Sequence, residues 1–89
     1  ALAKCVKKGN GEFDLDARLS LSDFSERIKV PLPYEEFDTV GGYVLDLFGR
    51  IPLKGESVED DRKILFRITE IKGTRMSRVS ATIPSSEDR

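Results

Sequence analysis

The chain of 89 residues contains no histidine and a single cysteine. Without histidine, the Ser/His/Asp and Cys/His arrangements of nucleophilic catalysis and the His-containing zinc sites are excluded. The lone Cys5 cannot form a disulfide within the chain, which favours a reducing compartment. A free-standing enzyme would have to use carboxylates such as Asp38 or Glu70, and no spacing in the sequence predicts a cleft that they share.

An excess of charge of one sign and a long hydrophobic run are also missing. The 15 lysines and arginines nearly balance the 16 aspartates and glutamates, so the formal charge is −1. Nucleic acids and anionic membranes attract proteins through a basic excess, which this chain lacks. No segment approaches the ~20 apolar residues of a membrane span, and no signal-peptide pattern opens the chain. We expect a soluble domain that neither binds nucleic acid nor inserts into a membrane, and we expect no metal site.

The length and composition indicate one small globular domain with a thin core. Charged residues make up 35% of the chain and apolar residues 38%, which is typical of a globular protein with a highly charged surface. We expect the domain to cover residues 1–83. The polar segment 84–89 is predicted to be a disordered tail.

The best-defined element is a helix that begins at Asp38 or Thr39, whose side-chain oxygen can accept an N–H group of the first turn. Gly49 is placed where a left-handed residue ends a helix, and Pro52 cannot continue one. Apolar residues recur at helical spacing and predict one buried stripe. The stripe consists of Val40, Val44, Leu47, Phe48 and Ile51.

The rest of the chain predicts a shorter helix over residues 19–29, capped by Ser20, and several strands. Alternating apolar residues place strands at 2–8, 12–16, 56–59, 63–71 and 75–83, with a bulge near Glu70. The order is therefore β-β-α-α-β-β-β. Two apolar helices after two strands predict an α+β fold, in which both helices pack on one face of a mainly antiparallel five-stranded sheet.

The segments Asp38–Gly42 and Leu47–Pro52, followed by Gly55-Glu56, make the sequence similar to the CorC/HlyC transporter-associated domain. The resemblance covers nearly the whole chain. It includes Gly11–Leu15 at the start and the segments 66–71 and 75–79 in the last hairpin. The sequence departs from the family in two turns, where Ala17 and the pair Asp61-Arg62 stand in place of a frequent glycine.

The resemblance implies a non-catalytic regulatory domain on the cytoplasmic side of a hemolysin-like or magnesium/cobalt-efflux membrane protein. Such a domain modulates ion transport through contacts with the neighbouring CBS and membrane domains of its parent protein. A homodimer is a further expectation, because strands at both chain ends leave sheet edges to pair. The family fold also resembles a subdomain of FAD-binding (PCMH-like) domains, so the alternative function is binding of FAD or an adenine nucleotide. No cofactor is predicted from the residues themselves, since Gly41-Gly42 lies in a helix pattern and not in a phosphate-binding loop.

Arg50, Arg75 and Arg78 are the candidate contacts for an anion or a partner, provided that the last hairpin lies beside Arg50. The alternative for Arg50 is a favourable interaction with the C-terminal dipole of the second helix, and the basic strand residues can equally be a solvated sheet face. Gly41 and Gly42 predict either close packing of helix against sheet or close approach of a ligand. Family-motif residues with a mainly structural role are Asp38, Thr39, Gly42, Gly49, Pro52 and Gly55.

Overall fold

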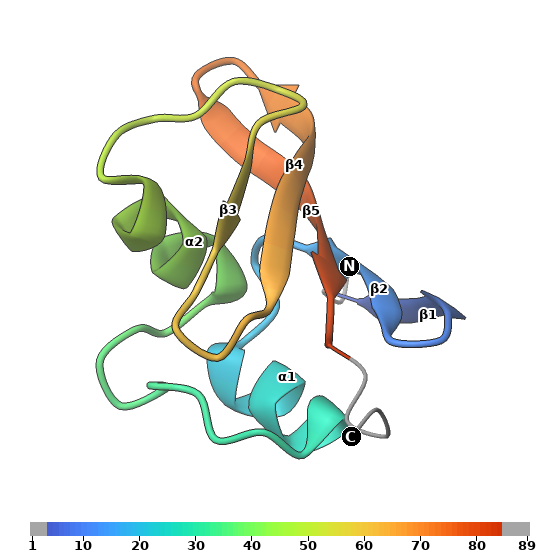
Figure 1. Ribbon diagram of the computed structural model, residues 1–89. Helices are drawn as coiled ribbons and strands as arrows, with labels where there is room; N and C mark the ends of the chain where they lie inside the picture. Colours follow the sequence, from blue (N-terminus) through green and yellow to red (C-terminus); the bar gives the residue numbers. More distant parts are fainter. Residues whose placement is uncertain (1–3, 85–89) are drawn as a thin grey trace.

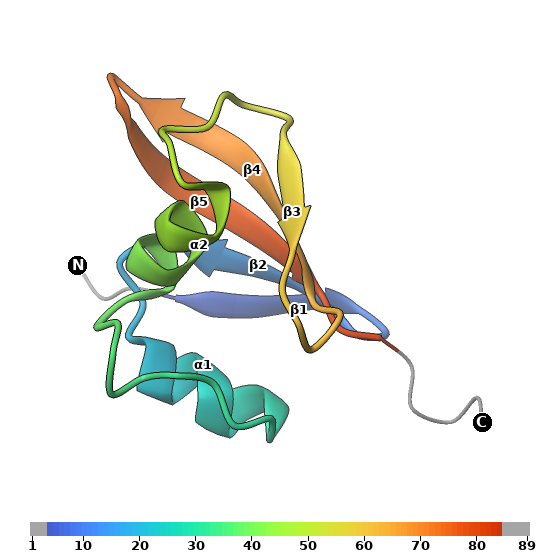
Figure 2. The same cartoon turned by 60° about the vertical axis from the view of Figure 1, so that its left-hand side comes forward.

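The computed structural model describes residues 4–84, which form two helices and one sheet of five strands (Figure 1). In chain order the elements are β1 (Cys5–Gly9), β2 (Glu12–Asp16), α1 (Leu21–Ile28), α2 (Val40–Phe48), β3 (Ser57–Glu59), β4 (Leu65–Lys72) and β5 (Arg75–Thr82). All neighbouring strands are antiparallel, and their spatial order is β1-β2-β5-β4-β3. Both helices lie on one face of the sheet (Figure 2), which confirms the predicted α+β architecture.

The core lies between the helices and the three central strands. Two rows of buried side chains cross β2, β5 and β4 in register: Phe13, Ala81 and Phe66 form one, and Leu15, Val79 and Ile68 form the other. These are the apolar positions of the alternating pattern, so the pattern placed the correct face inside. The helices cover the rows with fully buried Phe24, Val40 and Val44, and the ring of Phe24 meets that of Phe13 edge-on at 6.0 Å.

Both helices begin and end at capping residues. Ser20 caps α1 as predicted, with its hydroxyl accepting an N–H of the first turn. Of the two candidates for α2, Thr39 is the cap, and its Oγ1 accepts from the N–H of Gly42 at 3.1 Å. Gly49 ends α2 with a left-handed φ of 71°, which confirms its predicted place because an L residue there would be strained.

The starts of the two helices are bound to each other and to the end of β2. The N–H of Leu21 donates to the carbonyl of Asp38 at 2.9 Å, and the N–H of Val40 donates to that of Leu19 at 2.9 Å. The N–H of Gly41 donates to the carbonyl of Ala17 at 2.8 Å. A Cβ at Gly41 would lie 2.9 Å from that same oxygen, so the close-packing interpretation holds at this glycine.

Other element bounds differ from the prediction by a few residues, and one apolar position is placed differently. Ile51 does not continue the stripe of α2: the helix ends at Phe48, and Ile51 is 58% exposed. The predicted first strand begins outside the described residues. The bulge near Glu70 is confirmed, since the register between β4 and β5 shifts on both sides of that residue.

Two non-glycine residues among those described have a left-handed φ: Lys29, which ends α1 at 60°, and Lys63, in the turn before β4, at 71°. Lys63 lies directly after Asp61-Arg62, the pair that stands in a turn where the CorC/HlyC family often has a glycine.

The described chain enters and leaves the sheet at opposite ends of β2 (Figure 2). The carbonyl of Lys4 accepts from the N–H of Asp16 at 3.0 Å, whereas the N–H of Ile83 donates to the carbonyl of Gly11 at 2.6 Å. Residues 85–89, most of the predicted tail, lie outside the described residues.

Candidate functional site

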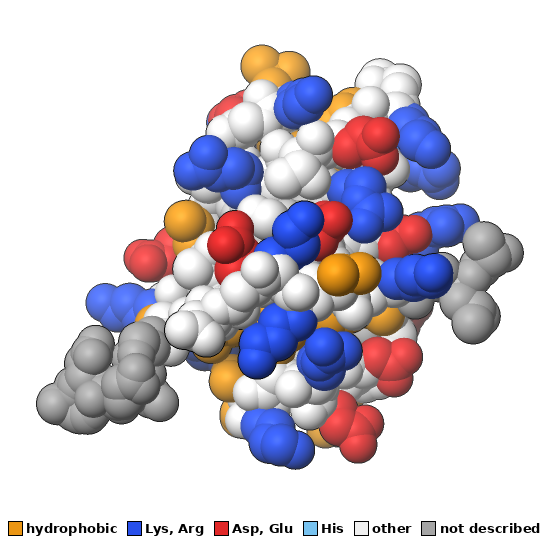
Figure 3. All heavy atoms as spheres, turned by 90° about the vertical axis from the view of Figure 1, so that its right-hand side faces the viewer, with side chains coloured by type: hydrophobic (Ala, Val, Ile, Leu, Met, Phe, Trp, Pro, Cys, Tyr) orange, Lys and Arg blue, Asp and Glu red, His pale blue; other side chains and the backbone are white. Residues whose placement is uncertain are grey.

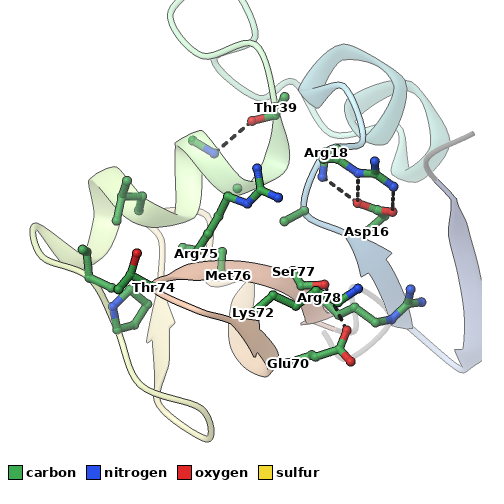
Figure 4. Close-up of a pocket in the computed structure, with 16 residues that line it drawn as sticks. Asp16, Arg18, Thr39, Glu70, Lys72, Thr74, Arg75, Met76, Ser77 and Arg78 are labelled. Atoms are coloured by element: carbon green, nitrogen blue, oxygen red, sulfur yellow. Dashed lines mark hydrogen bonds and ion pairs between the residues drawn. The ribbon is translucent and has the colours of Figure 1, made fainter. Parts of the chain in front are cut away.

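A groove of about 600 Å³ lies between α2 and the first half of β5 (Figure 4). Three further segments border it: the end of β2, the loop after α2 and the β4–β5 hairpin. Its lining residues include Ala17, Arg18, Gly42, Leu45, Ile51, Pro52, Lys72, Arg75 and Met76. The groove thus joins parts of the chain that are far apart in sequence, because β2 and β5 are neighbours in the sheet.

Apolar side chains in the groove are open to solvent. Leu45 is 42% exposed and Ile51 is 58% exposed, and both contribute to the lining, together with the buried Pro52 and Met76. Leaving large apolar side chains in water is unfavourable, and neighbouring exposed ones mark contact surfaces. The same loop continues to Leu53, which is 69% exposed.

Basic side chains outnumber acidic ones along the groove. Four cations (Arg18, Lys72, Arg75 and Arg78) and two carboxylates (Asp16 and Glu70) line it, an excess of two positive charges in a chain of charge −1. Figure 4 shows Arg75 extending from β5 toward α2, into the space beside the Asp16–Arg18 pair, whereas Lys72, Glu70 and Arg78 lie along the hairpin.

Two of the four cations have partners. Arg18 contacts Asp16 at 3.0 Å, and this hydrogen-bonded pairing is the main cause that lowers the pKa of Asp16 from its ordinary 3.8 to about 2. Arg78 contacts Asp14 at 3.1 Å. Within residues 4–84 neither Lys72 nor Arg75 is in an ion pair. The groove therefore presents cations that are free to contact an anionic group.

The backbone N–H groups at the start of α2 are already engaged. Those of Val40, Gly41 and Gly42 donate to Leu19, Ala17 and Thr39, and the fourth, of Tyr43, donates to the carbonyl of Thr39. Phosphate sites at helix starts depend on free N–H groups. An anion in this groove would therefore be contacted by side chains and not by the backbone N–H groups of α2.

Arg50 lies elsewhere and has a partner of its own. Its guanidinium forms two hydrogen bonds to Glu56, one at 3.0 Å, and stacks over the Phe48 ring at 5.7 Å. Glu56 also accepts from the N–H of Leu53 at 2.8 Å. The Arg50 hydrogen bonds, followed by the Leu53 bond, lower the pKa of Glu56 from its ordinary 4.5 to about 2. Arg50 thus closes the loop after α2 and does not line the groove with Arg75 and Arg78.

The remaining family-motif residues shape this loop and the helix starts. The N–H of Gly55 donates to the carbonyl of Ile68 at 2.8 Å, and the N–H of Ile68 donates to that of Glu56 at 2.9 Å. Pro52 is buried beneath the groove, and Asp38 supplies a backbone carbonyl to α1. The loop that carries Ile51 is therefore tied to β4 and holds its side chains in place.

Asp60 is a buried carboxylate that the sequence pattern did not single out. It is 5% exposed and accepts hydrogen bonds from the Tyr43 hydroxyl at 2.7 Å and from the N–H groups of Arg62 and Ile64 at 2.9 Å. Burial, and then the bond to Asp60, raise the pKa of Tyr43 well above its usual range. The hydrogen bonds of Asp60 connect α2 to the turn before β4, so this carboxylate stabilises the fold.

The sheet face opposite α2 is a weaker candidate. Figure 3, which views that side, shows acidic and basic side chains interspersed. A shallow depression there is bordered by three cations (Lys8, Arg67 and Arg78) and three carboxylates (Glu12, Asp14 and Glu70). With balanced charge and mostly polar side chains, this face corresponds to the solvated strand surface expected from the alternation.

Sequence reasoning found Arg75 and Arg78 but did not find Arg18 or Glu56. Lys72 was visible only as one of several basic strand residues. Both have partners nearby in the chain, Asp16 for Arg18 and Arg50 for Glu56, but neither pair lies within a helix or a strand, whose period would mark it. Among the described residues, no helix is long and apolar enough to cross a membrane, and no cluster of carboxylate or cysteine side chains is arranged to hold a metal ion.

Comparison with known proteins gives a consistent result. The family model CorC_HlyC, described as a transporter associated domain, matches residues 6–85. The magnesium and cobalt efflux protein CorC of Vibrio cholerae is 33% identical over 75 residues, which are 84% of this chain and 25% of that protein. The chain thus spans about a quarter of the length of such relatives.

Solved structures of similar domains are matched over almost their entire length. A hemolysin domain from Enterococcus faecalis V583 has a TM-score of 0.80 at 25% identity, over 91% of this chain and 98% of that one. The transporter associated domain CorC_HlyC from Nitrosomonas europaea has a TM-score of 0.78 at 26% identity, over 94% and 98%.

Proposed function

Since the chain belongs to the CorC/HlyC family of transporter-associated domains, we propose that it is a non-catalytic regulatory module on the cytoplasmic side of a membrane ion transporter. The observation that carries the proposal is the family match over residues 6–85. The relatives named magnesium and cobalt efflux proteins indicate divalent cations as the transported ions.

We propose that regulation acts through contacts with the neighbouring CBS and membrane domains of the parent protein. Two features of the chain support this. It corresponds to about a quarter of the CorC relatives, so most of such a protein lies outside this domain. The groove beside α2 also combines exposed apolar side chains with free cations, a composition suited to a protein contact.

Deletion of residues 1–83 from the full transporter tests the regulatory role. Efflux of magnesium and cobalt is followed in cells across a series of external ion concentrations, with protein amount and membrane insertion measured in parallel. The expected result is a transporter that remains inserted but responds differently to ion concentration. Identical efflux with and without the domain at every concentration would refute the proposal.

Cysteine labelling tests the cytoplasmic placement. Lys54 is exposed on the loop after α2, so Lys54→Cys in a Cys5→Ser background places one accessible thiol on the domain. A membrane-impermeant maleimide is expected to label this thiol only after the cells are permeabilised. Labelling of intact cells would place the domain outside. Thr82→Cys, exposed at the end of β5, serves as a second reporter.

FAD or adenine-nucleotide binding, and homodimerisation, stay predictions. Calorimetric titration of the chain with FAD tests the first, and light scattering at two protein concentrations tests the second. The engaged N–H groups at the start of α2 offer no specific support for a nucleotide, so the regulatory module is the function we favour.

A further inference from the structure

We propose that the groove between α2 and β5 is a docking site for an acidic polypeptide segment that carries apolar side chains between its carboxylates. This inference rests on the proposed function, because it names the chemistry of the contact through which the module would act. Three properties of the groove support it, and each points to a different feature of the segment.

The first property is charge. The groove has an excess of two positive charges, and Arg75 and Lys72 form no ion pair within residues 4–84. Arg75 extends toward α2 across the opening, where a ligand would pass (Figure 4). Complementary charge favours association with an acidic partner and disfavours a basic one. The partner therefore carries carboxylates or other anionic groups.

The second property separates a polypeptide from a phosphate compound. Small anionic cofactors are usually held by several backbone N–H groups in an enclosed site. Here the first N–H groups of α2 all have acceptors. The groove is also open, since Leu45 and Ile51 in its lining are 42% and 58% exposed. An open groove with side-chain cations suits an extended chain with spaced carboxylates better than a compact phosphate.

The third property is the apolar lining. Leu45 and Ile51 are among the most exposed large hydrophobic side chains of the described residues. The loop that holds Ile51 is fixed to β4 by the backbone bonds of Gly55 and Ile68 and is closed by the Arg50–Glu56 pair. Apolar side chains held in a fixed position contact a partner without a large loss of conformational entropy. The segment therefore needs apolar side chains to cover them.

The test is a titration of the isotope-labelled chain with blocked hexapeptides, followed by amide chemical shifts. The probe has the sequence Glu-Leu-Glu-Glu-Leu-Glu. One control replaces each Glu by Lys, and a second replaces each Leu by Ser. FAD and inorganic phosphate are titrated separately. The acidic apolar peptide is expected to shift amides in the groove, such as those of Gly42, Leu45 and Arg75, more strongly than either control peptide, and increasing salt is expected to weaken it.

Two variants locate the site. Arg75→Glu is expected to weaken binding roughly 3–10-fold, which is the effect of losing and reversing a surface ion pair. Gly42→Gln is expected to obstruct the groove without unfolding the chain, because a Cβ at Gly42 meets only Thr39 Oγ1, at 3.4 Å. The matched control is Arg67→Glu on the opposite sheet face, which is expected to leave the affinity unchanged.

Several outcomes would overturn the proposal. They are no shifts at millimolar acidic peptide, equal binding of the lysine peptide, or shifts confined to the face around Arg67. Stronger shifts of the same amides with FAD or phosphate would assign the groove to a small anion instead. Failure here leaves the transport experiment unaffected, because deletion of the domain can alter efflux through any other surface.

Discussion

Adjacent glycines at the start of α2 are expected to respond in opposite ways to the same substitution. Gly41 and Gly42 lie in one helical turn, so replacement by alanine gives each a similar gain in helix propensity, up to about 1 kcal/mol. Their surroundings differ. A Cβ at Gly41 would lie 2.9 Å from the carbonyl oxygen and 3.1 Å from the Cβ of Ala17, whereas a Cβ at Gly42 would lie 3.4 Å from Thr39 Oγ1 alone.

The cost at Gly41 comes from atoms that cannot rotate away. The carbonyl of Ala17 belongs to the backbone and accepts the N–H of Gly41 at 2.8 Å, so α2 must move off β2 and lengthen this bond. Forcing a methyl group into a packed contact costs about 1–3 kcal/mol, and a lost hydrogen bond adds about 1 kcal/mol. After a propensity gain of about 0.5–1 kcal/mol is subtracted, Gly41→Ala is expected to lower the free energy of unfolding by about 1–3.5 kcal/mol, and Gly42→Ala is expected to raise it by about 0.5–1 kcal/mol.

Urea unfolding of the chain and the two variants, followed by circular dichroism, measures the difference. For a domain of this size, the expected difference of about 2–4 kcal/mol between the variants corresponds to roughly 8–32 °C in melting temperature. The slope of unfolding free energy against urea is expected to stay constant, because neither methyl group changes the surface that unfolding exposes. Equal stability of the two variants, within about 0.5 kcal/mol, would refute the close contact between α2 and Ala17.

Three further predictions concern stability. Asp60→Ala is expected to lower the free energy of unfolding by about 3–5 kcal/mol, since three hydrogen bonds to a buried carboxylate are lost, and Tyr43→Phe by about 1–2 kcal/mol; urea unfolding measures both. Lys29→Gly and Lys63→Gly are each expected to raise the free energy of unfolding by about 1 kcal/mol, because each removes a lysine with a left-handed φ. Lys54 does not have a left-handed φ, so Lys54→Gly is the control and is expected not to raise the free energy of unfolding; an equal increase there would refute the reasoning. The pKa values of Asp16 and Glu56 are lowered to about 2, so the contribution of these carboxylates to folding stability is present above pH ~4.5 and is lost as the pH falls toward 2. The melting temperature is therefore expected to fall less steeply with pH in Glu56→Gln than in the unchanged chain. Parallel curves of melting temperature against pH would contradict the pairing of Glu56 with Arg50.

The elements could be predicted because their signals are local. Alternation along β2, β4 and β5 identified the buried face, and the caps at Ser20, Thr39 and Gly49 marked helix ends within a few residues of where they occur. Each of these patterns involves residues close together in sequence, so it can be recognised without knowing the order of the strands in the sheet or what each helix packs against.

The path of the loop after α2 could not be predicted in the same way. Ile51 fits the helical period of the preceding stripe, yet the chain leaves the helix at Gly49 and is held by bonds to Ile68 in β4. Those bonds turn Ile51 into the groove and bring Glu56 to Arg50. The period was correct to Phe48, and beyond that residue a contact with a distant strand decides the path of the chain.

The groove itself depends on the arrangement of the strands. Arg18 follows β2, and Arg75 begins β5, so they face the same opening only because these strands are neighbours in the sheet. The sequence did identify Arg75 and Arg78 as candidate contacts, but it grouped them with Arg50. That grouping assumed that the last hairpin lies beside the end of α2, where Arg50 instead has Glu56 as its partner.

Lys4 and Ile83, near the two ends of the described residues, lie at opposite ends of β2, so the groove is closer to one of them than to the other. Lys4 lies beside Asp16, which lines the groove, whereas Ile83 lies beside Gly11, roughly 17 Å from Asp16 at the ~3.4 Å rise of a strand residue. A tethered segment binds at an effective concentration that depends on whether its linker spans the distance, and that falls as the linker lengthens. An acidic segment joined ahead of Lys4 would therefore reach the groove with a shorter linker, and at a higher effective concentration, than the same segment joined after Ile83.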